Sequence, residues 1–297
     1  MRKKILVTVI TYPQPSARHV ETVCTAGFTE EGDFVRVYPI RMRMLDGGML
    51  HKWNWYEMDV EKRPGEDFRP ESLHASSPPD ATSLGFIRAD PSDGWEERRE
   101  RTIGRTKAYT SMDELLSASD PTKPGFISLA VFRPGRIKGL TVRKWDSEKR
   151  RMVREKKDRI LAATRTDGDP AASEFDVPEY WEMADTIPYQ FNCEFTDDTG
   201  KVWSLMVEDW EIYSIFRRYL REYGPFTATH MLRKRFAVDF QGKDIYLFLG
   251  TRLRDQRLHR PEPYSIIGFF YPPGPQSNDR ILSYHRERPQ GTHGNQA

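Results

Sequence analysis

The stretch that decides the fold reads Ile5-Leu6-Val7-Thr8-Val9-Ile10, then Val20-Glu21-Thr22-Val23-Cys24-Thr25-Ala26-Gly27-Phe28, and finally Phe34-Val35-Arg36-Val37-Tyr38-Pro39-Ile40. Each run is rich in β-branched and aromatic residues. The turn Glu31-Gly32-Asp33 leaves only a short connection between the second and third runs. Three β-rich runs joined in this way are typical of the opening of a small antiparallel sheet or barrel.

The third run also carries the first candidate binding surface. Val35 and Val37 supply the apolar face of this strand, which leaves Arg36 and Tyr38 on the outward face. The cations and rings that follow in the chain are Arg41, Arg43, Trp53 and Trp55. Cations beside flat rings on a strand surface can hold a nucleic-acid backbone and stack its bases. The alternative is that the rings belong to the core and the arginines are merely solvated.

Outward from these strands, the rest of the N-terminal part alternates strands with helices. A fourth strand is predicted at residues 55–60, followed by a polar loop that contains 69–72 and the prolines 78–79. Helices are predicted from Asp93 to about 104, and from Ser111, which with Glu114 fits a capping box, to about 119. Strands at 126–132 and 137–142 and a basic helix over 146–163 complete this part.

The C-terminal part repeats the strand-rich theme without a strict sequence repeat. Strands are predicted at 189–195 and 201–207, joined by a hairpin turn at 197–200. Helices are predicted at 209–223 and 227–240, and strands that are buried on both faces at 245–249 and 265–271. We divide the chain into a barrel domain at 1–164, a second β-rich domain with helices at 165–272, and a flexible tail at 273–297.

Composition bounds the class of protein. The 297 residues are 37% hydrophobic and 12% aromatic, which suffices for a packed core. Cys24 and Cys193 are too few for a disulfide framework or a four-thiolate zinc site, and we expect both to be small buried hydrophobes. The apolar run after Met1-Arg2-Lys3-Lys4 is too short for a secretory signal or a membrane span. We expect a soluble, cytoplasmic protein that contacts no membrane.

Charge is unevenly distributed. The net charge is only +2, so attraction to polyanions must come from local patches. Residues 143–159 are strongly basic, although Glu148, Glu155 and Asp158 interrupt them and a solvated helix face explains them as well. A second basic cluster is better placed, in a loop between two apolar strands, because loops at strand ends commonly carry binding groups. Its members are Arg252, Arg254, Arg257, His259 and Arg260.

Enzyme signatures are scarce. Glu208-Asp209-Trp210-Glu211 concentrates carboxylates where a strand gives way to a helix. Asp209 suits a helix N-cap and Glu211 complements the helix dipole, whereas a metal or general-base role needs partners that the sequence does not show. There is no phosphate-loop pattern, no nucleotide-binding glycine fingerprint and no His-Glu-x-x-His. We predict no catalytic residue, no metal site and no cofactor.

Two short motifs resemble the dual OB-fold proteins of bacteria. These are Glu21-x-x-Cys24-x-Ala26-Gly27 and the following Val35-Arg36-Val37-Tyr38-Pro39-Ile40, and the run Ser128-Leu129-Ala130-Val131 is similar to that family's second conserved strand. Tyr38 stands between Arg36 and Pro39, where the family has a direct Arg-Pro pair. The resemblance covers about the first 145 residues and implies nucleic-acid binding. The family that it points to is associated with conflicts between bacteria and phages or mobile elements.

We therefore predict an α+β, mostly antiparallel protein: an OB-like barrel with helical insertions, joined to a second sheet-and-helix unit. The predicted function is binding of single-stranded or distorted nucleic acid. The alternatives are a subunit that binds a protein partner without nucleic-acid contact, and a metal-dependent nuclease or hydrolase around Asp209 and Glu211. The candidate nucleic-acid-binding residues are Arg36, Tyr38, Arg41, Arg43, Trp55, Arg252, Arg254, Arg257 and Arg260.

Overall fold

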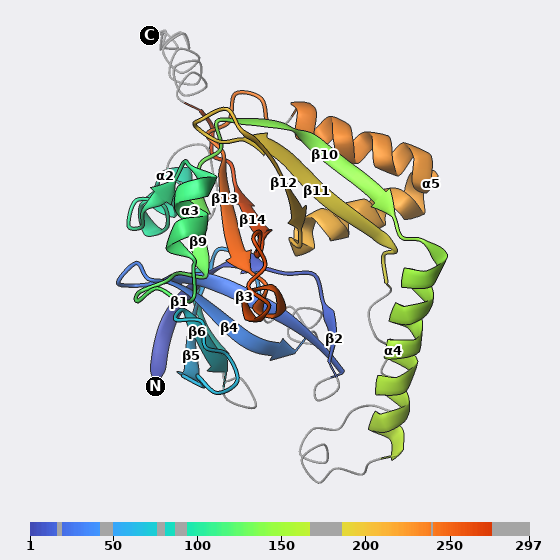
Figure 1. Cartoon of the computed structure of the whole chain (residues 1–297), viewed down its shortest axis with the longest axis horizontal. Coiled ribbons are helices and arrows are strands. Elements are labelled where there is room, and N and C mark those ends of the chain that lie inside the picture. Colours follow the sequence, from blue (N-terminus) through green and yellow to red (C-terminus); the bar gives the residue numbers. More distant parts are fainter. Residues whose placement is uncertain are drawn as a thin grey trace, which may run out of the picture.

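The first half of the chain forms a closed five-stranded barrel. The structure, a computed structural model, describes residues 1–16, 20–41, 50–75, 81–86, 94–166, 186–238 and 240–274. The barrel strands are β1 (Arg2–Ile10), β3 (Val20–Thr29), β4 (Phe34–Arg41), β5 (Asn54–Glu61) and β6 (Ser72–Ala75). They follow the order β1-β3-β4-β6-β5, and β5 pairs again with β1 to close the ring (Figure 1). The β4–β6 pair is parallel, and the other barrel pairs are antiparallel.

Two short strands extend the barrel. β2 (Gln14–Ser16) pairs with β3, and β7 (Ala81–Phe86) pairs with β5. The sequence-based prediction of a loop through this part of the chain is wrong for β6, because its residues lie between β4 and β5 and close the ring. A strand of four residues flanked by prolines has too little periodicity to be found from sequence.

The second half forms one seven-stranded sheet in the order β10-β11-β12-β14-β13-β9-β8. Its strands are β8 (Ala108–Tyr109), β9 (Leu129–Phe132), β10 (Arg136–Lys144), β11 (Tyr189–Thr196), β12 (Val202–Val207), β13 (Tyr246–Thr251) and β14 (Tyr264–Phe270). Its helices and those before it are α2 (Gly94–Arg101), α3 (Met112–Ala118), α4 (Ser147–Thr166), α5 (Trp210–Val238) and α6 (Leu253–Arg257). Figure 1 shows α5 along the outside of the sheet and α4 extending away from it.

The second sheet is strongly curled. β9 and β10 lie five strand steps apart in the sheet order, which in a flat sheet is about 24 Å. Only residues 133–135 connect them, and the four residue steps from Phe132 to Arg136 span at most about 14 Å. The sheet must therefore bend until β9 and β10 act as one strand that pairs with both β13 and β11.

With β9 and β10 taken together, the second sheet has the connectivity of the first barrel. In both, the first three strands are antiparallel neighbours, the third strand pairs in parallel with the fifth, and the fourth strand returns to the first. α5 occupies the connection between the third and fourth strands of the second sheet. The architecture is thus repeated although the sequence shows no strict repeat.

The change from one sheet to the other falls between β7 and β8, and not near residue 165. Strands β9 and β10, which we assigned to the barrel domain, pair only with strands of the second sheet among the described residues. The predicted strands and helices are otherwise found close to their expected positions. Ser111 caps α3 by accepting a hydrogen bond from the Glu114 amide, and Gly224, with φ 76° and ψ 174°, divides α5 into the two helices that we predicted.

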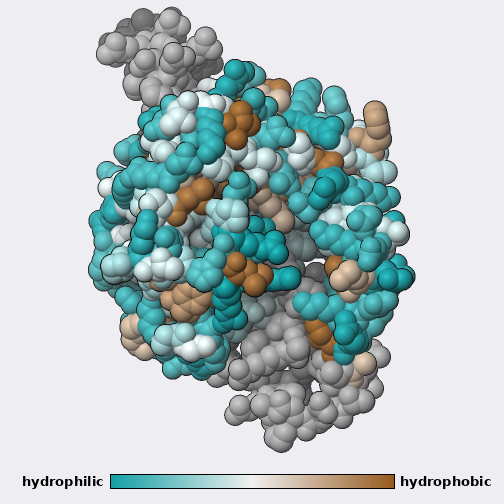
Figure 2. Space-filling view, viewed as in Figure 1, coloured by the Kyte–Doolittle hydropathy of each residue, from teal (hydrophilic) through white to brown (hydrophobic). Residues whose placement is uncertain are grey.

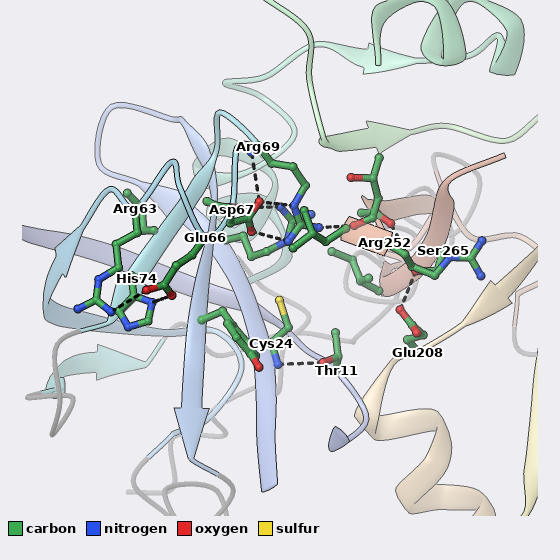
Figure 3. Close-up of a pocket in the computed structure, with 18 of the residues that line it drawn as sticks. Thr11, Cys24, Arg63, Glu66, Asp67, Arg69, His74, Glu208, Arg252 and Ser265 are labelled. Atoms are coloured by element: carbon green, nitrogen blue, oxygen red, sulfur yellow. Dashed lines mark hydrogen bonds and ion pairs between the residues drawn. The ribbon is translucent and has the colours of Figure 1, made fainter. Parts of the chain in front are cut away.

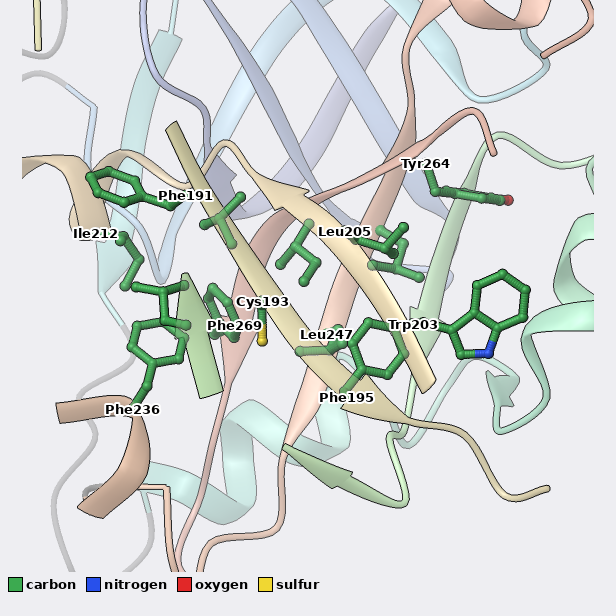
Figure 4. Close-up of a cluster of buried hydrophobic side chains, with 14 of the residues drawn as sticks. Phe191, Cys193, Phe195, Trp203, Leu205, Ile212, Phe236, Leu247, Tyr264 and Phe269 are labelled. Atoms are coloured by element: carbon green, nitrogen blue, oxygen red, sulfur yellow. The ribbon is translucent and has the colours of Figure 1, made fainter. Parts of the chain in front are cut away.

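Three apolar clusters hold the fold together. One fills the barrel and includes Val35 and Val37. A second lies between the second sheet and α5 and includes Phe191, Cys193 and Phe269 (Figure 4). The third cluster joins the two halves, because side chains on the outer face of the barrel pack against β9, β13 and β14. Its members include Leu6, Phe28, Phe34, Leu129, Phe248 and Ile267. β13 and β14 are therefore buried on both faces, as their sequences indicated.

Candidate functional site

The pocket with the richest chemistry among the described residues lies where the two halves meet. This cavity of about 430 Å³, here called the seam pocket, is lined on one side by the outer face of β3 and β4 and by the β5–β6 loop. Its other side comes from β13, β14 and the start of α6. Figure 3 shows Arg63, Glu66 and His74 towards one end, and Arg252, Ser265 and Glu208 towards the other.

Arg36 lies in the wall of the pocket and is only 3% exposed. Its Nη1 donates to Ser72 Oγ at 3.0 Å and to Ser128 Oγ at 3.1 Å, and its Nη2 donates to the Ser128 carbonyl at 3.3 Å. A Cβ at Gly250 would stand 3.3 Å from Nη2, so glycine gives the guanidinium its space. Burial, followed by the nearby Arg69 cation, lowers the pKa of Arg36.

Arg69 is the second buried cation of the pocket. Its Nε and Nη2 donate to the two carboxylate oxygens of Asp67 at 2.8 and 2.6 Å, and its Nη1 donates to the Thr251 carbonyl at 2.5 Å. The β5–β6 loop of the barrel is thereby tied to β13 of the second sheet. Burial acts to raise the pKa of Asp67, but the hydrogen bonds and charge of Arg69 outweigh it, so this pKa is lowered.

The wall from the second sheet combines an arginine with a carboxyl group. Arg252 Nε lies 2.6 Å from Asp255 Oδ2, and Ser265 Oγ donates to Glu208 Oε2 at 2.7 Å. Burial is the main cause that raises the pKa of Glu208. Glu208 is therefore a carboxyl group that takes up a proton more readily than an exposed one.

The barrel side of the pocket carries a ring, a thiol and a histidine. Tyr38 is 43% exposed, and its hydroxyl accepts a hydrogen bond from Thr22 Oγ1 at 3.3 Å. Cys24 is half-buried, and burial raises the pKa of its thiol, so it is not an activated nucleophile. His74 Nδ1 lies 3.9 Å from Glu66 Oε2.

The structure brings together Arg36, Tyr38 and Arg252 of the predicted site, and separates Trp55 from them. Trp55 is half-buried and packs against the apolar cluster between the two halves. Arg36 does occupy the outward face of β4, but the expectation that it faces solvent is wrong, because the second sheet covers that face. Arg41 is the last residue of β4, and Arg43 lies outside the described residues.

The second predicted cluster lies on and around α6, beside the seam pocket. Arg254 and Arg257 are exposed, and Arg257 Nη2 donates to the Glu66 carbonyl at 2.6 Å. Arg260 Nε lies 3.3 Å from Asp255, which Arg252 also contacts. This cluster is thus partly engaged in holding α6 against the β5–β6 loop.

Asp209 and Glu211 have a structural partner in Lys52. The Lys52 ammonium lies 2.8 Å from Asp209 Oδ2 and 3.2 Å from Glu211 Oε2, and Asp209 Oδ1 accepts the Glu211 amide at 2.7 Å. Asp209 therefore has the predicted cap geometry at α5 and also pairs with a lysine of the barrel. In the described part of the chain, no three His, Cys, Asp or Glu side chains gather to hold a metal ion.

The basic helix α4 presents its cations to solvent. The exposed ones are Lys149, Arg150, Arg151, Arg154, Lys156 and Arg159. Ile160 of the same helix is buried, and the face of the molecule seen in Figure 2 is mostly hydrophilic with scattered apolar side chains. Across the described residues, no helix is long and apolar enough to cross a membrane.

Sequence reasoning missed the residues that complete the pocket from other loops. Arg63, Asp67 and Arg69 come from the β5–β6 connection, and Glu208 and Ser265 come from the second sheet. The available signal was the density of charges in a segment that also holds Pro64, Gly65 and Pro70, since charged loops between strands often bind ligands. Nothing in the sequence indicates that this loop faces α6.

Family models match nearly the whole chain. The model described as "Domain of unknown function (DUF8758)" matches residues 1–103, and that described as "Domain of unknown function (DUF8757)" matches residues 108–288, more than half of the chain. The chain belongs to the DUF8757 family. The two matches meet between α2 and β8, in agreement with the change of sheet described above.

No curated protein matches the chain. Among solved structures, a murine DNA-binding protein bound to double-stranded DNA is similar with a TM-score of 0.31 and 9% identity, over 91% of this chain and 94% of that one.

Proposed function

We propose that the chain is a dual OB-type protein that binds single-stranded nucleic acid at the seam pocket and the surface around it. The observation that carries the proposal is the position of the pocket. OB barrels bind oligonucleotides on the face of their second and third strands and on the loops beside it. In this barrel those elements are β3, β4, the residues after β1 and the β5–β6 loop, and all of them line the pocket.

The groups around the pocket suit a nucleic-acid strand. Tyr38 offers an exposed ring on which a base can stack. Arg254 and Arg257 on the adjoining α6 are exposed cations that can contact phosphates. The repeated connectivity of the second sheet supports the dual OB-type assignment, and the setting that the resemblance implies is bacterial conflict with phages or mobile elements.

Fluorescence anisotropy with labelled 20-nucleotide single strands of DNA and RNA, and with a duplex control, tests the proposal. We expect Tyr38→Ala to weaken single-strand binding about 5- to 150-fold, since a stacked base contributes ~1–3 kcal/mol. Arg254→Ala should lower the slope of log affinity against log salt by ~0.7, the value for one phosphate contact on a single strand.

Two exposed side chains outside the pocket lining provide matched controls. Tyr223→Ala removes a ring from α5, and Arg101→Ala removes a cation from the end of α2. Both variants should bind like the wild type. The proposal fails if no strand binds, or if Tyr38→Ala and Arg254→Ala bind no more weakly than these controls.

A further inference from the structure

Arg36 differs from the other arginines of the seam pocket in having no carboxylate of the described residues as a direct partner. Among the described residues, Arg63, Arg69 and Arg252 each have a carboxylate within 4 Å, and Arg36 has none. Its hydrogen bonds go to two serine hydroxyls and a carbonyl. The carboxylates of Asp67 and Glu71 offset its charge only from beyond contact distance, and Glu71 is linked to it through Ser128, whose hydroxyl donates to Glu71 Oε2 at 2.6 Å.

A buried cation without a direct counter-charge is costly, and a second cation beside it adds repulsion. The charge of Arg69 repels Arg36 in this way, and Asp67, the carboxylate that offsets Arg69, already accepts three hydrogen bonds from it. An anion in the pocket would supply the missing counter-charge. The two arginines are fixed in place by Ser72, Ser128 and the Thr251 carbonyl, so they need not be ordered when the anion binds.

The size of the pocket limits what can carry this anion. About 430 Å³ is at the lower end of the range for small-molecule sites, and suits roughly one nucleotide but not an oligonucleotide. Arg36 and Arg69 are both buried, so a strand that passes through would have to bury its chain on both sides of the phosphate. A terminal phosphate avoids this and also carries about −1.5 to −2 charges at pH 7, more than the single charge of an internal phosphodiester.

We propose that the seam pocket binds a single nucleotide through a terminal phosphate that contacts Arg36 and Arg69, with the base towards Tyr38. A free nucleoside monophosphate and the phosphorylated end of a strand share this chemistry. If the function proposed above holds, the ligand is the phosphorylated end of a strand. For that ligand, this inference rests on the proposed function. It goes further by assigning the pocket to an end and the surrounding surface to the rest of the strand.

Anisotropy competition with the wild-type full-length chain separates the sources. The competitors are one oligonucleotide sequence with a 5′-phosphate, with a 3′-phosphate or with hydroxyl ends, and a nucleoside 5′-monophosphate. We expect one phosphorylated end to bind at least tenfold more tightly than the hydroxyl ends, and the monophosphate to abolish this preference. Equal binding of all ends overturns the inference and leaves the proposed function standing. If the monophosphate binds and no strand binds, the pocket assignment is supported and the proposed function is overturned.

Substitutions at and beside Arg36 test where the phosphate binds. Arg36→Lys keeps the charge but loses the paired Nη contacts, and should reduce the end preference about tenfold while hydroxyl-ended strands bind as before. Thermal melting shows whether this variant is folded, and Gly250→Ala, which crowds Nη2, provides a second perturbation of the same guanidinium. An unchanged end preference in a folded Arg36→Lys protein would remove the phosphate from this site.

The pH dependence reports on the neighbouring carboxyl group. Glu208 is bonded to Ser265 of β14. The titratable and charged groups that face it are Arg252 and Asp255 around α6, Arg36 of β4, Cys24 of β3 and Tyr213 of α5. Because its pKa is raised, Glu208 gains a proton as the pH falls towards that pKa, which removes a negative charge near the phosphate. Acidification also protonates the phosphate in both proteins, so the expected result is a comparison: the ratio of the end preference in the wild type to that in Glu208→Gln should rise on mild acidification. Glu208→Gln still contains the titration of the phosphate itself, whose second pKa is about 6. Identical pH profiles would exclude Glu208 from the site.

Discussion

We predict that breaking the contact between Lys52 and Asp209 by a single substitution causes a large loss of stability, which a second substitution should largely restore. The ammonium lies 2.8 Å from the carboxylate, and both side chains are buried. At an effective dielectric constant of about 20, that separation corresponds to an attraction of roughly 6 kcal/mol. Burial disfavours the ammonium, but Asp209 and Glu211 outweigh it and raise the pKa of Lys52. While Asp209 is ionised, this contribution is present up to pH 10.5 and is lost as the pH rises through the higher pKa of the folded-state ammonium. Burial raises the pKa of Asp209, so the contact is also lost at acidic pH, when this carboxylate gains a proton.

Lys52→Met should lower the free energy of unfolding by about 3–5 kcal/mol, because it leaves the Asp209 carboxylate buried without its partner. At about 2–4 °C per kcal/mol, the melting temperature should fall by ~6–20 °C. Lys52→Met with Asp209→Asn removes both charges and keeps an oxygen to accept the Glu211 amide, so it should recover most of the loss. Urea unfolding of the wild type, both single variants and the double variant gives the coupling energy.

The exposed pair of Lys107 and Glu114 is a suitable control, since Lys107→Met should leave the urea midpoint unchanged. The reasoning is refuted if Lys52→Met unfolds at the wild-type midpoint, or if the double variant is no more stable than Lys52→Met alone. Loss of a metal-dependent activity in a fully stable Asp209→Asn protein would instead favour the nuclease alternative.

Two further predictions concern the folds of the two halves. Gly27→Ala should cost about 3 kcal/mol or more, because its Cβ would stand 2.1 Å from the Leu6 carbonyl oxygen, and Gly65→Ala, with nothing within 4 Å, should leave the urea midpoint unchanged. Equal midpoints for these two variants would contradict the close approach of β1 and β3. Asp197→Ala should cost about 1–3 kcal/mol, because Asp197 accepts hydrogen bonds from the Thr199 and Lys201 amides and from Trp203 Nε1. Hydrogen bonds to Asp197 outweigh burial and lower its pKa. Its contribution to stability is therefore present above pH 3.8 and disappears as the pH falls through the folded-state pKa. Acid titration of the wild type should show this loss of stability, and Asp197→Asn should lack it.

Much of the fold could be predicted because local patterns carry it. The alternation in Tyr189–Thr196 gives a half-buried strand, and the three β-rich runs with the tight turn at 31–33 give the barrel opening. Ser111 and Gly224 mark a helix start and a helix break by backbone chemistry that needs no distant partner. The division into sheets could not be predicted, because strand pairing across tens of residues leaves no local trace in β9 and β10.

For the candidate site, the sequence by itself determined that Arg36 lies opposite Val35 and Val37 on β4, since side chains alternate along any strand. Only the tertiary structure decided that this outward face is covered by the second sheet, which buries Arg36 and unites it with Arg69, Arg252 and Glu208. The physical reason is that the direction of a side chain follows from the backbone of its own strand. The groups that surround the side chain depend on how apolar surfaces pack together. Surfaces such as those of Phe28 and Phe248 come into contact only when the whole chain has folded.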